Sequence, residues 1–201
     1  SMKKVLFLAS GSGSNIENII EYFKNKSINI DYKVVTNRKN AGVFERASRL
    51  QVPIYHFSKD EIHSEIFYNF VNDYQPDLIV LAGFLFIFPA DVLASMPSKV
   101  INIHPALLPN YGGKGMYGMN VHEAVFENKE QFTGITIHYV NEKYDEGEVI
   151  LQQKTDISNC KNADEIALFL SSINPYLSKE ALQKMLYKHL ELTKIEAVTM
   201  I

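Results

Sequence analysis

The stretch "KVLFLASGSGSNIENIIEYF", residues 4–23, decides the fold. It begins with an apolar run, residues 4–10, that ends in serine and glycine. Residues 15–23 follow, with apolar side chains repeated at helical spacing. This order predicts a strand, a glycine-rich turn and a helix. The helically spaced residues are Ile16, Ile19, Ile20 and Phe23.

The same order recurs along the chain. Short apolar runs alternate with longer segments of helical periodicity, which indicates βαβ units and a parallel sheet. We therefore expect an α/β protein with a Rossmann-like, mostly parallel sheet flanked by helices. The expected strands are 32–37, 53–57, 77–83 and 100–104, and the expected helices are 41–50, 61–74 and 121–128.

The second half of the chain departs from this order. Residues 105–120 are rich in glycine and proline and are expected to form a loop. Residues 134–140 and 148–156 alternate in polarity and predict an antiparallel C-terminal hairpin on the sheet edge. Residues 164–189 have a helical pattern, which Pro175 is expected to interrupt. We expect residues 1–201 to form a single domain.

Composition excludes several classes of protein. The chain is 46% hydrophobic and 21% charged, as in a globular domain, and its net charge of −3 comes without a Lys/Arg cluster suited to nucleic acid. Cys160 is the single cysteine, which favours a reducing compartment, and we expect the cytoplasm. No apolar run is long enough to span a membrane. No histidine pair has the spacing of a metal site, so no metal is expected.

The turn "SGSGSN", residues 10–15, is a candidate phosphate site. Glycines let backbone amides approach a ligand, and the start of a helix offers free N–H groups and a favourable dipole. The turn is neither a dinucleotide fingerprint, because Ile16 stands where the third glycine belongs, nor a Walker loop, because it lacks Gly-Lys-Ser/Thr. The alternative is a capped tight turn without a ligand.

Asn102 and His104 form a second candidate, within "INIHPALLP" at residues 101–109. Side chains alternate in a strand, so these two face the same side at its carboxyl end, where open α/β sheets bind ligands. An amide N–H and an imidazolium together can stabilise a developing oxyanion, and histidine transfers protons near neutral pH. The alternative is a structural polar pair that binds the proline-rich loop.

The segment "NEKYDEG", residues 141–147, carries two acids, Asp145 and Glu146. A solvated acidic turn is the plain interpretation. If the hairpin folds back beside the strand of Asn102, one carboxylate would hold His104 in its charged form. Spacing alone leaves open which acid does so.

Aromatic residues follow the strand 77–83 in the run "GFLFIF", residues 83–88. Part of this run is expected to pack in the core, and Phe84 to Phe88 could also line an apolar slot for a flat ligand. The remaining histidines are assigned structural roles, with His122 placed near the site; the others are His56, His63, His138 and His189.

Four motifs together resemble a known family. They are "GSGSN", "VLAGF", "INIHPALLP" and "TGITIHYVNEKYDEGEVI", and in order and spacing they resemble the phosphoribosylglycinamide formyltransferases, within the folate-dependent formyltransferase family. The likeness covers roughly residues 3–155 and fades in the last quarter of the chain. The block I-N-x-H-P-x-L-L-P is the most specific of the four.

The resemblance implies roles for individual residues. It makes Asn102, His104 and Asp145 catalytic, with Asp145 keeping His104 charged, and it also places Asn102 in the folate site. It assigns binding of the substrate phosphate to Gly13, Ser14 and Asn15 in the N-terminal part of the domain. The folate site is expected in the C-terminal part of the domain. The remaining folate-binding residues that the resemblance implies are Lys59, Phe84, Leu85, Phe86, Ile87, Phe88, Val140, Asn141, Glu142 and Tyr144.

The implied activity is that of a one-carbon transferase in de novo purine biosynthesis. The formyl group of the co-substrate 10-formyltetrahydrofolate passes to the amine of 5-phosphoribosylglycinamide without a metal. The implied partners are these small molecules, and we expect a monomer or a weak homodimer.

Three features depart from the family pattern. Phe86 stands where many members carry arginine, and the loop 110–120, with Lys114, is longer than in some members. A ribose-binding glutamate is expected shortly before Pro175, but Ser172 to Asn174 stand there instead.

Two rival enzymes share the asparagine, histidine and aspartate. Methionyl-tRNA formyltransferase carries a further domain and a basic surface, and formyltetrahydrofolate hydrolase carries a regulatory domain. The non-enzymatic alternative is a nucleotide- or folate-binding module. Activity with and without 5-phosphoribosylglycinamide separates the implied transferase, the hydrolase and the binding module.

Overall fold

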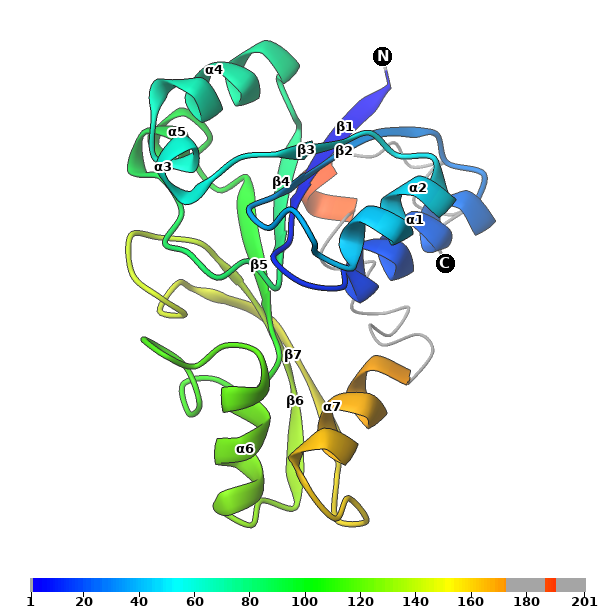
Figure 1. Cartoon of the computed structure of the whole chain (residues 1–201), viewed down its shortest axis with the longest axis vertical. Coiled ribbons are helices and arrows are strands. Elements are labelled where there is room, and N and C mark those ends of the chain that lie inside the picture. Colours follow the sequence, from blue (N-terminus) through cyan, green and yellow to red (C-terminus); the bar gives the residue numbers. More distant parts are fainter. Residues whose placement is uncertain (1, 173–186, 191–201) are drawn as a thin grey trace.

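A computed structural model describes residues 2–172 and 187–190. They form an α/β fold around one seven-stranded sheet of order β3-β2-β1-β4-β5-β6-β7 (Figure 1). The first five strands along the chain are parallel, and β6 and β7 are antiparallel, which confirms the predicted mixed sheet. The strands are β1 Lys3–Leu8, β2 Ile30–Thr36, β3 Ile54–His56, β4 Leu78–Ala82, β5 Val100–His104, β6 Phe132–Tyr139 and β7 Val149–Asp156.

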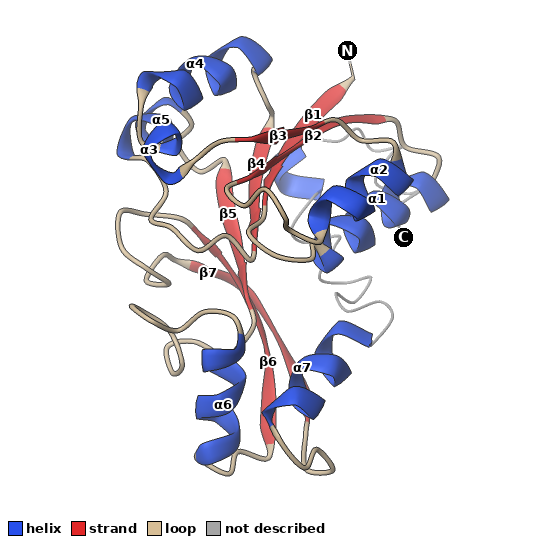
Figure 2. Ribbon diagram, viewed as in Figure 1, coloured by secondary structure: helices blue, strands red, loops and turns tan. Residues whose placement is uncertain are grey.

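Helices cover both faces of the sheet (Figure 2). One buried cluster joins α1 and α2 to one face, and a second joins α3, α4 and α5 to the other. The helices are α1 Ser14–Asn25, α2 Val43–Leu50, α3 Lys59–Ile62, α4 Glu65–Tyr74, α5 Ala90–Ser95, α6 Met119–Glu127 and α7 Ala163–Ser172. None of the described helices is both long and apolar enough to cross a membrane.

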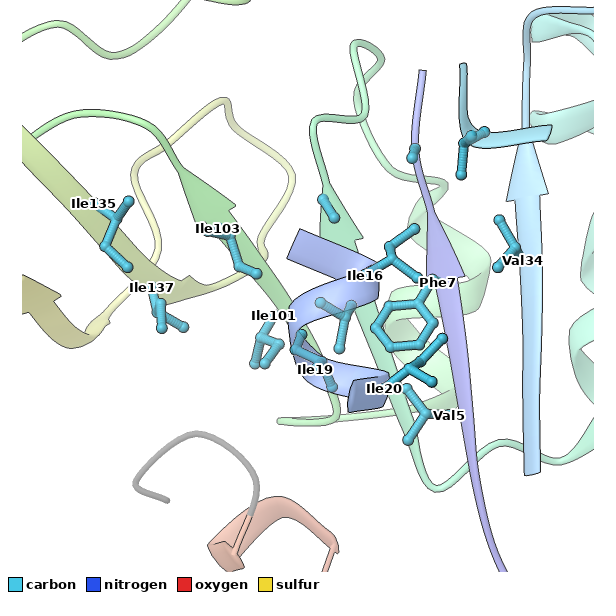
Figure 3. Close-up of a cluster of buried hydrophobic side chains, with 14 of the residues drawn as sticks. Val5, Phe7, Ile16, Ile19, Ile20, Val34, Ile101, Ile103, Ile135 and Ile137 are labelled. Atoms are coloured by element: carbon cyan, nitrogen blue, oxygen red, sulfur yellow. The ribbon is translucent and has the colours of Figure 1, made fainter. Parts of the chain in front are cut away.

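Alternation along β1 supplies both clusters. Val5 and Phe7 pack under α1, whereas Leu6 and Leu8 face the opposite side, and all four are fully buried. Figure 3 shows Phe7 among the helically spaced isoleucines of α1. The stretch 4–23 therefore forms the strand, turn and helix that its pattern predicts.

The prediction of one helix over 61–74 was wrong. Ser64 interrupts it, because its side chain accepts a hydrogen bond from Ile66 N and so begins α4. Before it, Ser58 and Glu61 form a capping box that begins the short α3. The helix α5 was not predicted, and the expected interruption near Pro175 lies outside the described residues.

The hairpin β6–β7 extends beyond the carboxyl end of β5, with α6 and α7 on either side (Figure 1). Its register shifts between Ile137 and His138, where β6 and β7 form a bulge. Bulges bend a strand and redirect its side chains. The shift lies directly beside the strand that carries Asn102.

Candidate active site

The carboxyl ends of β1, β4 and β5 lie at one edge of the sheet, since these neighbouring strands are parallel. Each is followed by a segment with a candidate role, namely residues 10–15, 83–88 and 105–115. Adjacent strands are about 4.8 Å apart, so the first and last of these strands are about 10 Å apart. Such an edge can accommodate one ligand across several loops.

The turn 10–15 presents backbone N–H groups. Gly13, with φ 72°, precedes α1, and no side chain caps the helix, which leaves the N–H groups of the first turn to a ligand. Nothing lies within 4 Å of a side chain built at Gly11. Asn15 Oδ1 is buried without a hydrogen-bond partner among the described residues. An open approach and an unpaired polar atom favour a ligand over a plain turn.

Ser10 connects this turn to the neighbouring strand ends. Its hydroxyl donates to Asn37 Oδ1 at 2.5 Å and accepts from Leu85 N at 3.1 Å, and its own N–H donates to Gly83 O. The side chain is buried. The predicted phosphate turn and the predicted folate segment therefore share one hydroxyl.

Asn102 and His104 lie on one face of β5, opposite His138 and Thr136 of β6. Residues directly opposite in an antiparallel pair have side chains on the same side, so four polar residues gather there. Thr136 Oγ1 donates to Ala106 O, and it accepts from Leu108 N, which fixes the chain that leaves β5.

His104 is held at both ring nitrogens. Nδ1 lies 3.3 Å from Asp145 Oδ1, and Nε2 lies 2.7 Å from Tyr111 O. A carboxylate and a carbonyl oxygen only accept hydrogen bonds, so the doubly protonated ring satisfies both contacts. The structure thus brings Asp145, rather than Glu146, to His104.

Asp145 is surrounded by hydrogen-bond donors. Burial alone would raise its pKa, but hydrogen bonds from His104 and His138, together with the N–H of Gly113 at 3.0 Å from Oδ2, hold the pKa well below its ordinary value. Asp145 is therefore ionised at neutral pH. Gly112 packs against it, since a side chain there would meet Asp145 Cβ at 3.2 Å.

His138 belongs to this centre, although its sequence context suggested a structural role. It is 2% exposed, and its Nε2 lies 3.0 Å from Asn102 Nδ2 and 3.6 Å from Asp145 Oδ1. The alternation "GITIHY", residues 134–139, did contain a signal, because Thr136 and His138 share a face. The register that brings this face beside Asn102 is not readable from the sequence.

His122 is buried near the same centre. Burial, with the neighbouring charge of His104 as a smaller cause, lowers the pKa of His122. Its Nδ1 is buried without a partner within the described part of the chain. The prediction that His122 lies near the site agrees with this electrostatic contact.

The segment 84–88 divides between core and surface. Phe88 is 2% exposed and packs on Phe67, so its side chain belongs to the core. Phe84 and Phe86 are half-buried with their rings in edge contact at 5.7 Å. Lys59 Nζ lies 5.3 Å from the centre of the Phe86 ring, a cation–π contact.

The backbone of the same segment is fixed by His63. Its Nε2 donates to Ile87 O at 2.8 Å. With Leu85 N held by Ser10, two backbone groups of the segment have defined positions. His63, expected to have no functional partner, therefore supports the predicted folate segment.

The second predicted folate segment, Val140 to Tyr144, follows β6 and is largely exposed. A cavity of about 920 Å³ adjoins it. Its lining includes Leu93, Val100, Val140, Asn141 and Glu142. Three of the predicted folate residues thus face a space large enough for a small ligand.

Other predicted positions do not join the centre. Lys114 is exposed in the loop after β5. The side chains of Ser172 to Asn174, where the resemblance implies a ribose-binding glutamate, lie outside the described residues. Among residues 2–172 and 187–190, no group of three potential ligands could hold a metal ion.

Comparison with known proteins adds a family. Residues 3–176 match the model of the formyl transferase family. The chain is 37% identical over 172 residues to a chloroplastic phosphoribosylglycinamide formyltransferase of Arabidopsis thaliana, covering 82% of this chain and 59% of the relative. It is 30% identical over 168 residues to phosphoribosylglycinamide formyltransferase of Escherichia coli strain K12, covering 81% of this chain and 77% of the relative.

The fold is similar to solved structures of proteins that are named phosphoribosylglycinamide formyltransferase. The enzyme from Bacillus halodurans has a TM-score of 0.79 and 27% identity, over 94% of this chain and 98% of that one. The chain spans 59% and 55% of the length of two plant relatives, from Arabidopsis thaliana and Vigna unguiculata.

Proposed function

The chain belongs to the formyl transferase family, and on that premise we propose that it transfers the formyl group of 10-formyltetrahydrofolate to the amine of 5-phosphoribosylglycinamide. This reaction is a step of de novo purine biosynthesis. Relatives from a plant and a bacterium with this activity in their names support the choice of substrate. The observation that carries the proposal is His104, held between Asp145 and an acceptor at its other ring nitrogen.

The reaction is an acyl transfer. The amine nitrogen of 5-phosphoribosylglycinamide attacks the formyl carbon, and negative charge develops on the formyl oxygen as the carbon becomes tetrahedral. In the complex, the formyl oxygen takes the place of Tyr111 O as the acceptor of His104 Nε2–H. An amide N–H of Asn102 donates to the same oxygen, and both donors stabilise its charge. When the carbon–nitrogen bond to the folate breaks, the proton lost by the amine passes to the folate nitrogen.

Asp145 keeps His104 charged through this sequence. The carboxylate lies 3.3 Å from Nδ1 and accepts its hydrogen, and the lowered pKa of Asp145 means that the carboxylate is ionised at neutral pH. Its second oxygen accepts from Gly113 N–H, which fixes its orientation. Asp145 also offers a route, through water, for the proton that leaves the amine.

We place the substrates in the two halves of the domain. Gly13, Ser14 and Asn15 hold the ribonucleotide phosphate at the start of α1, where the N–H groups are uncapped. The folate lies between residues 84–88 and 140–144, with Lys59 near its glutamate end. The half-buried Phe84 and Phe86 support this placement, since they offer apolar surface to a flat ring.

We keep the monomer or weak homodimer and the cytoplasm as proposals. Size-exclusion chromatography with light scattering tests the first. Cell fractionation tests the second, which is open because the relatives from Arabidopsis thaliana and Vigna unguiculata are named as chloroplastic.

One assay tests the activity. The protein is incubated with 10-formyltetrahydrofolate, alone and with 5-phosphoribosylglycinamide, and folate absorbance is followed. Turnover that requires the ribonucleotide supports the proposal. Turnover with formyl folate alone identifies a hydrolase, and binding without turnover identifies a binding module.

The variant His104→Ala tests the site. Loss of the charged donor should lower turnover about 100- to 1,000-fold, while ribonucleotide binding measured by calorimetry stays within a few-fold of the wild type. His56→Ala is the control, since His56 lies at the end of β3 and donates to Asn37 O instead. Equal turnover in His104→Ala and the wild type would exclude His104 as the catalytic group.

A further inference from the structure

The first turn of α2 packs on the glycine-rich turn that precedes α1, and the two helices lie side by side (Figure 1). Val43 N donates to Gly11 O at 3.0 Å, and Arg46 Nε donates to Ser12 O at 2.7 Å. A side chain at Gly13 would meet Val43 Cγ2 at 2.6 Å, so the contact is close. Two successive carbonyl groups of the turn are therefore held by α2.

Holding these carbonyls also sets the direction of two N–H groups. In a trans peptide unit the N–H points away from the carbonyl, and both peptide units here are trans. The N–H groups of Ser12 and Gly13 therefore face away from α2. Neither donates to another backbone group among the described residues, so both are available to a ligand at the start of α1.

The guanidinium of Arg46 has a second partner in Glu17, which lies in the first turn of α1. Nη1 of Arg46 and Nη1 of Arg49 each bind one oxygen of this carboxylate. Hydrogen bonds from Arg49 and Arg46 hold the pKa of Glu17 below its ordinary value, so Glu17 is ionised at neutral pH. Glu17 follows Ser14 by three residues, which is about 4.5 Å along the helix axis.

An ionised acid at this place favours the helix but opposes the binding of an anion. A carboxylate in the first turn stabilises the helix dipole, whereas a phosphate at the same N–H groups would be repelled by its negative charge. The ion pairs of Glu17 with Arg46 and Arg49 offset that charge. A guanidinium is suited to hold Ser12 O and Glu17 together, because it carries several donors in a fixed fork.

We propose that Arg46 is a positioning residue of the ribonucleotide site. Its Nε–H holds Ser12 O so that the N–H of Gly13 is directed at the phosphate, and its Nη1–H pairs with Glu17 so that the first turn of α1 accepts a dianion. Arg46 does not touch the reacting atoms, so its effect is on phosphate affinity rather than on acyl transfer. The proposal rests on the function proposed above, which places the phosphate at this turn.

Binding of ribose 5-phosphate, the part of the ribonucleotide that carries the phosphate, tests this role without turnover. In calorimetry, Arg46→Ala should bind it about 30-fold more weakly than the wild type, because the bond to the turn and the charge that offsets Glu17 are both lost. Lys24→Ala is the control, since it removes an exposed positive charge from the last turn of α1, and it should stay within about 2-fold of the wild type. Equal affinities of Arg46→Ala and the wild type, or no binding by the wild type, overturn the proposal.

Substitution of Glu17 separates the effect of charge from a loss of structure. Glu17→Gln keeps the bond from Arg46 to Ser12 O, so it should bind ribose 5-phosphate about 5-fold more tightly, and in Arg46→Ala it should recover about 5-fold of the lost affinity. Glu21→Gln removes the same charge one turn further along α1 and should change the affinity less than about 2-fold. The proposal is contradicted if Glu17→Gln gives no gain in either background, since a purely structural role predicts a further loss when the partner of Arg49 is removed.

Steady-state kinetics distinguish the role of Arg46 from the proposed function. In the active enzyme, Arg46→Ala should raise KM for 5-phosphoribosylglycinamide about 30-fold and leave kcat and KM for formyl folate within about 2-fold of the wild type. Formyl transfer with an unchanged ribonucleotide KM refutes the role of Arg46 alone. The expected ribose 5-phosphate affinities without formyl transfer support that role and refute only the proposed activity.

Discussion

Ser10 joins three strand ends through one buried hydroxyl. Its hydroxyl donates to Asn37, which follows β2, and accepts from the N–H of Leu85, which follows β4. Ser10 is also the first residue of the turn 10–15, which follows β1. Such a residue couples the predicted phosphate and folate sites without touching the reacting atoms. Its removal leaves two polar groups without their partner.

Ser10→Ala should therefore lower the free energy of unfolding by about 1–3 kcal/mol and raise the KM for formyl folate, because Leu85 N–H loses its acceptor. Urea unfolding and steady-state kinetics measure the two effects. Ser95→Ala is a matched control, since Ser95 Oγ donates to Val92 O of its own helix. Equal effects on formyl-folate KM in the two variants would contradict the coupling.

Asp145 makes the free energy of unfolding depend on pH in the acid range. Its pKa is held below the ordinary value of 3.8 in the folded protein, so the stabilisation is complete above that value and is lost as pH falls further, toward the folded pKa. The gap in unfolding free energy between the wild type and Asp145→Asn should be constant from about pH 5 to 6 and narrow below about pH 4.

Urea unfolding across this range measures the gap. Glu146→Gln provides the control, because it removes a charge from an exposed side chain at the same turn. A gap for Asp145→Asn that does not change with pH would show that its carboxylate is not stabilised by its neighbours.

The sequence indicates some of these residues better than others. Asn102 and His104 are recognisable because two polar residues, two positions apart, interrupt an apolar strand at its end. The choice of Asp145 over Glu146 came from the family resemblance, and here it follows from the fold of loop 140–148. His138 was missed because its partner Asn102 is 36 positions away, and register between strands is set by tertiary packing.

At the scale of elements, the helices show where periodicity is insufficient. Residues 61–74 have one continuous apolar pattern, yet Ser58 and Ser64 each begin a helix by capping its free N–H groups. The apolar pattern reports which face is buried, but a cap decides where the helix begins. The six-residue α5 is too short for a periodic pattern and follows Pro89.

Ser64→Ala should destabilise the protein by about 1 kcal/mol, since Ile66 N–H loses its acceptor at the start of α4. Urea unfolding measures the difference. Ser48→Ala, at an exposed position inside α2, should leave stability unchanged or slightly higher because alanine favours helix. A loss in Ser48→Ala as large as that in Ser64→Ala would argue against capping as the cause.

At the scale of the whole molecule, two buried clusters share one sheet. Ile19 lies in the cluster under α1 and Phe67 in the cluster under α4, and both side chains are fully buried. Because β1 and β4 contribute to both clusters, neither face can lose its packing alone. We expect the described fold to unfold in one cooperative transition.

Ile19→Ala should cost about 2–5 kcal/mol and Phe67→Ala about 3–5 kcal/mol, both as shifts of the same transition. Circular dichroism and tyrosine fluorescence, followed together in urea, measure them. Two separate transitions, each sensitive to one substitution, would show that the faces unfold independently.

The α/β architecture itself is predictable because each strand and helix of the parallel half carries its own local pattern, as residues 4–23 show. The order β3-β2-β1-β4-β5 follows from how those patterned faces pack, which local periodicity does not encode. The surroundings of the folate segments 84–88 and 140–144 are harder still to predict from the sequence. Their neighbours come from α3 and α5, which lie far from them along the chain or were not predicted.

The close approach of Gly147 to the Tyr139 carbonyl distinguishes two kinds of related chain. A chain that retains the asparagine and histidine of β5 but has any side chain at the position of Gly147 cannot keep that carbonyl beside His138. The loop 140–148 of such a chain has to follow another path, and the acid that Asp145 brings to His104 here would be displaced with it. This one glycine is therefore a marker, among related sequences, of chains whose loop can carry an acid to the histidine of β5 along the path described here.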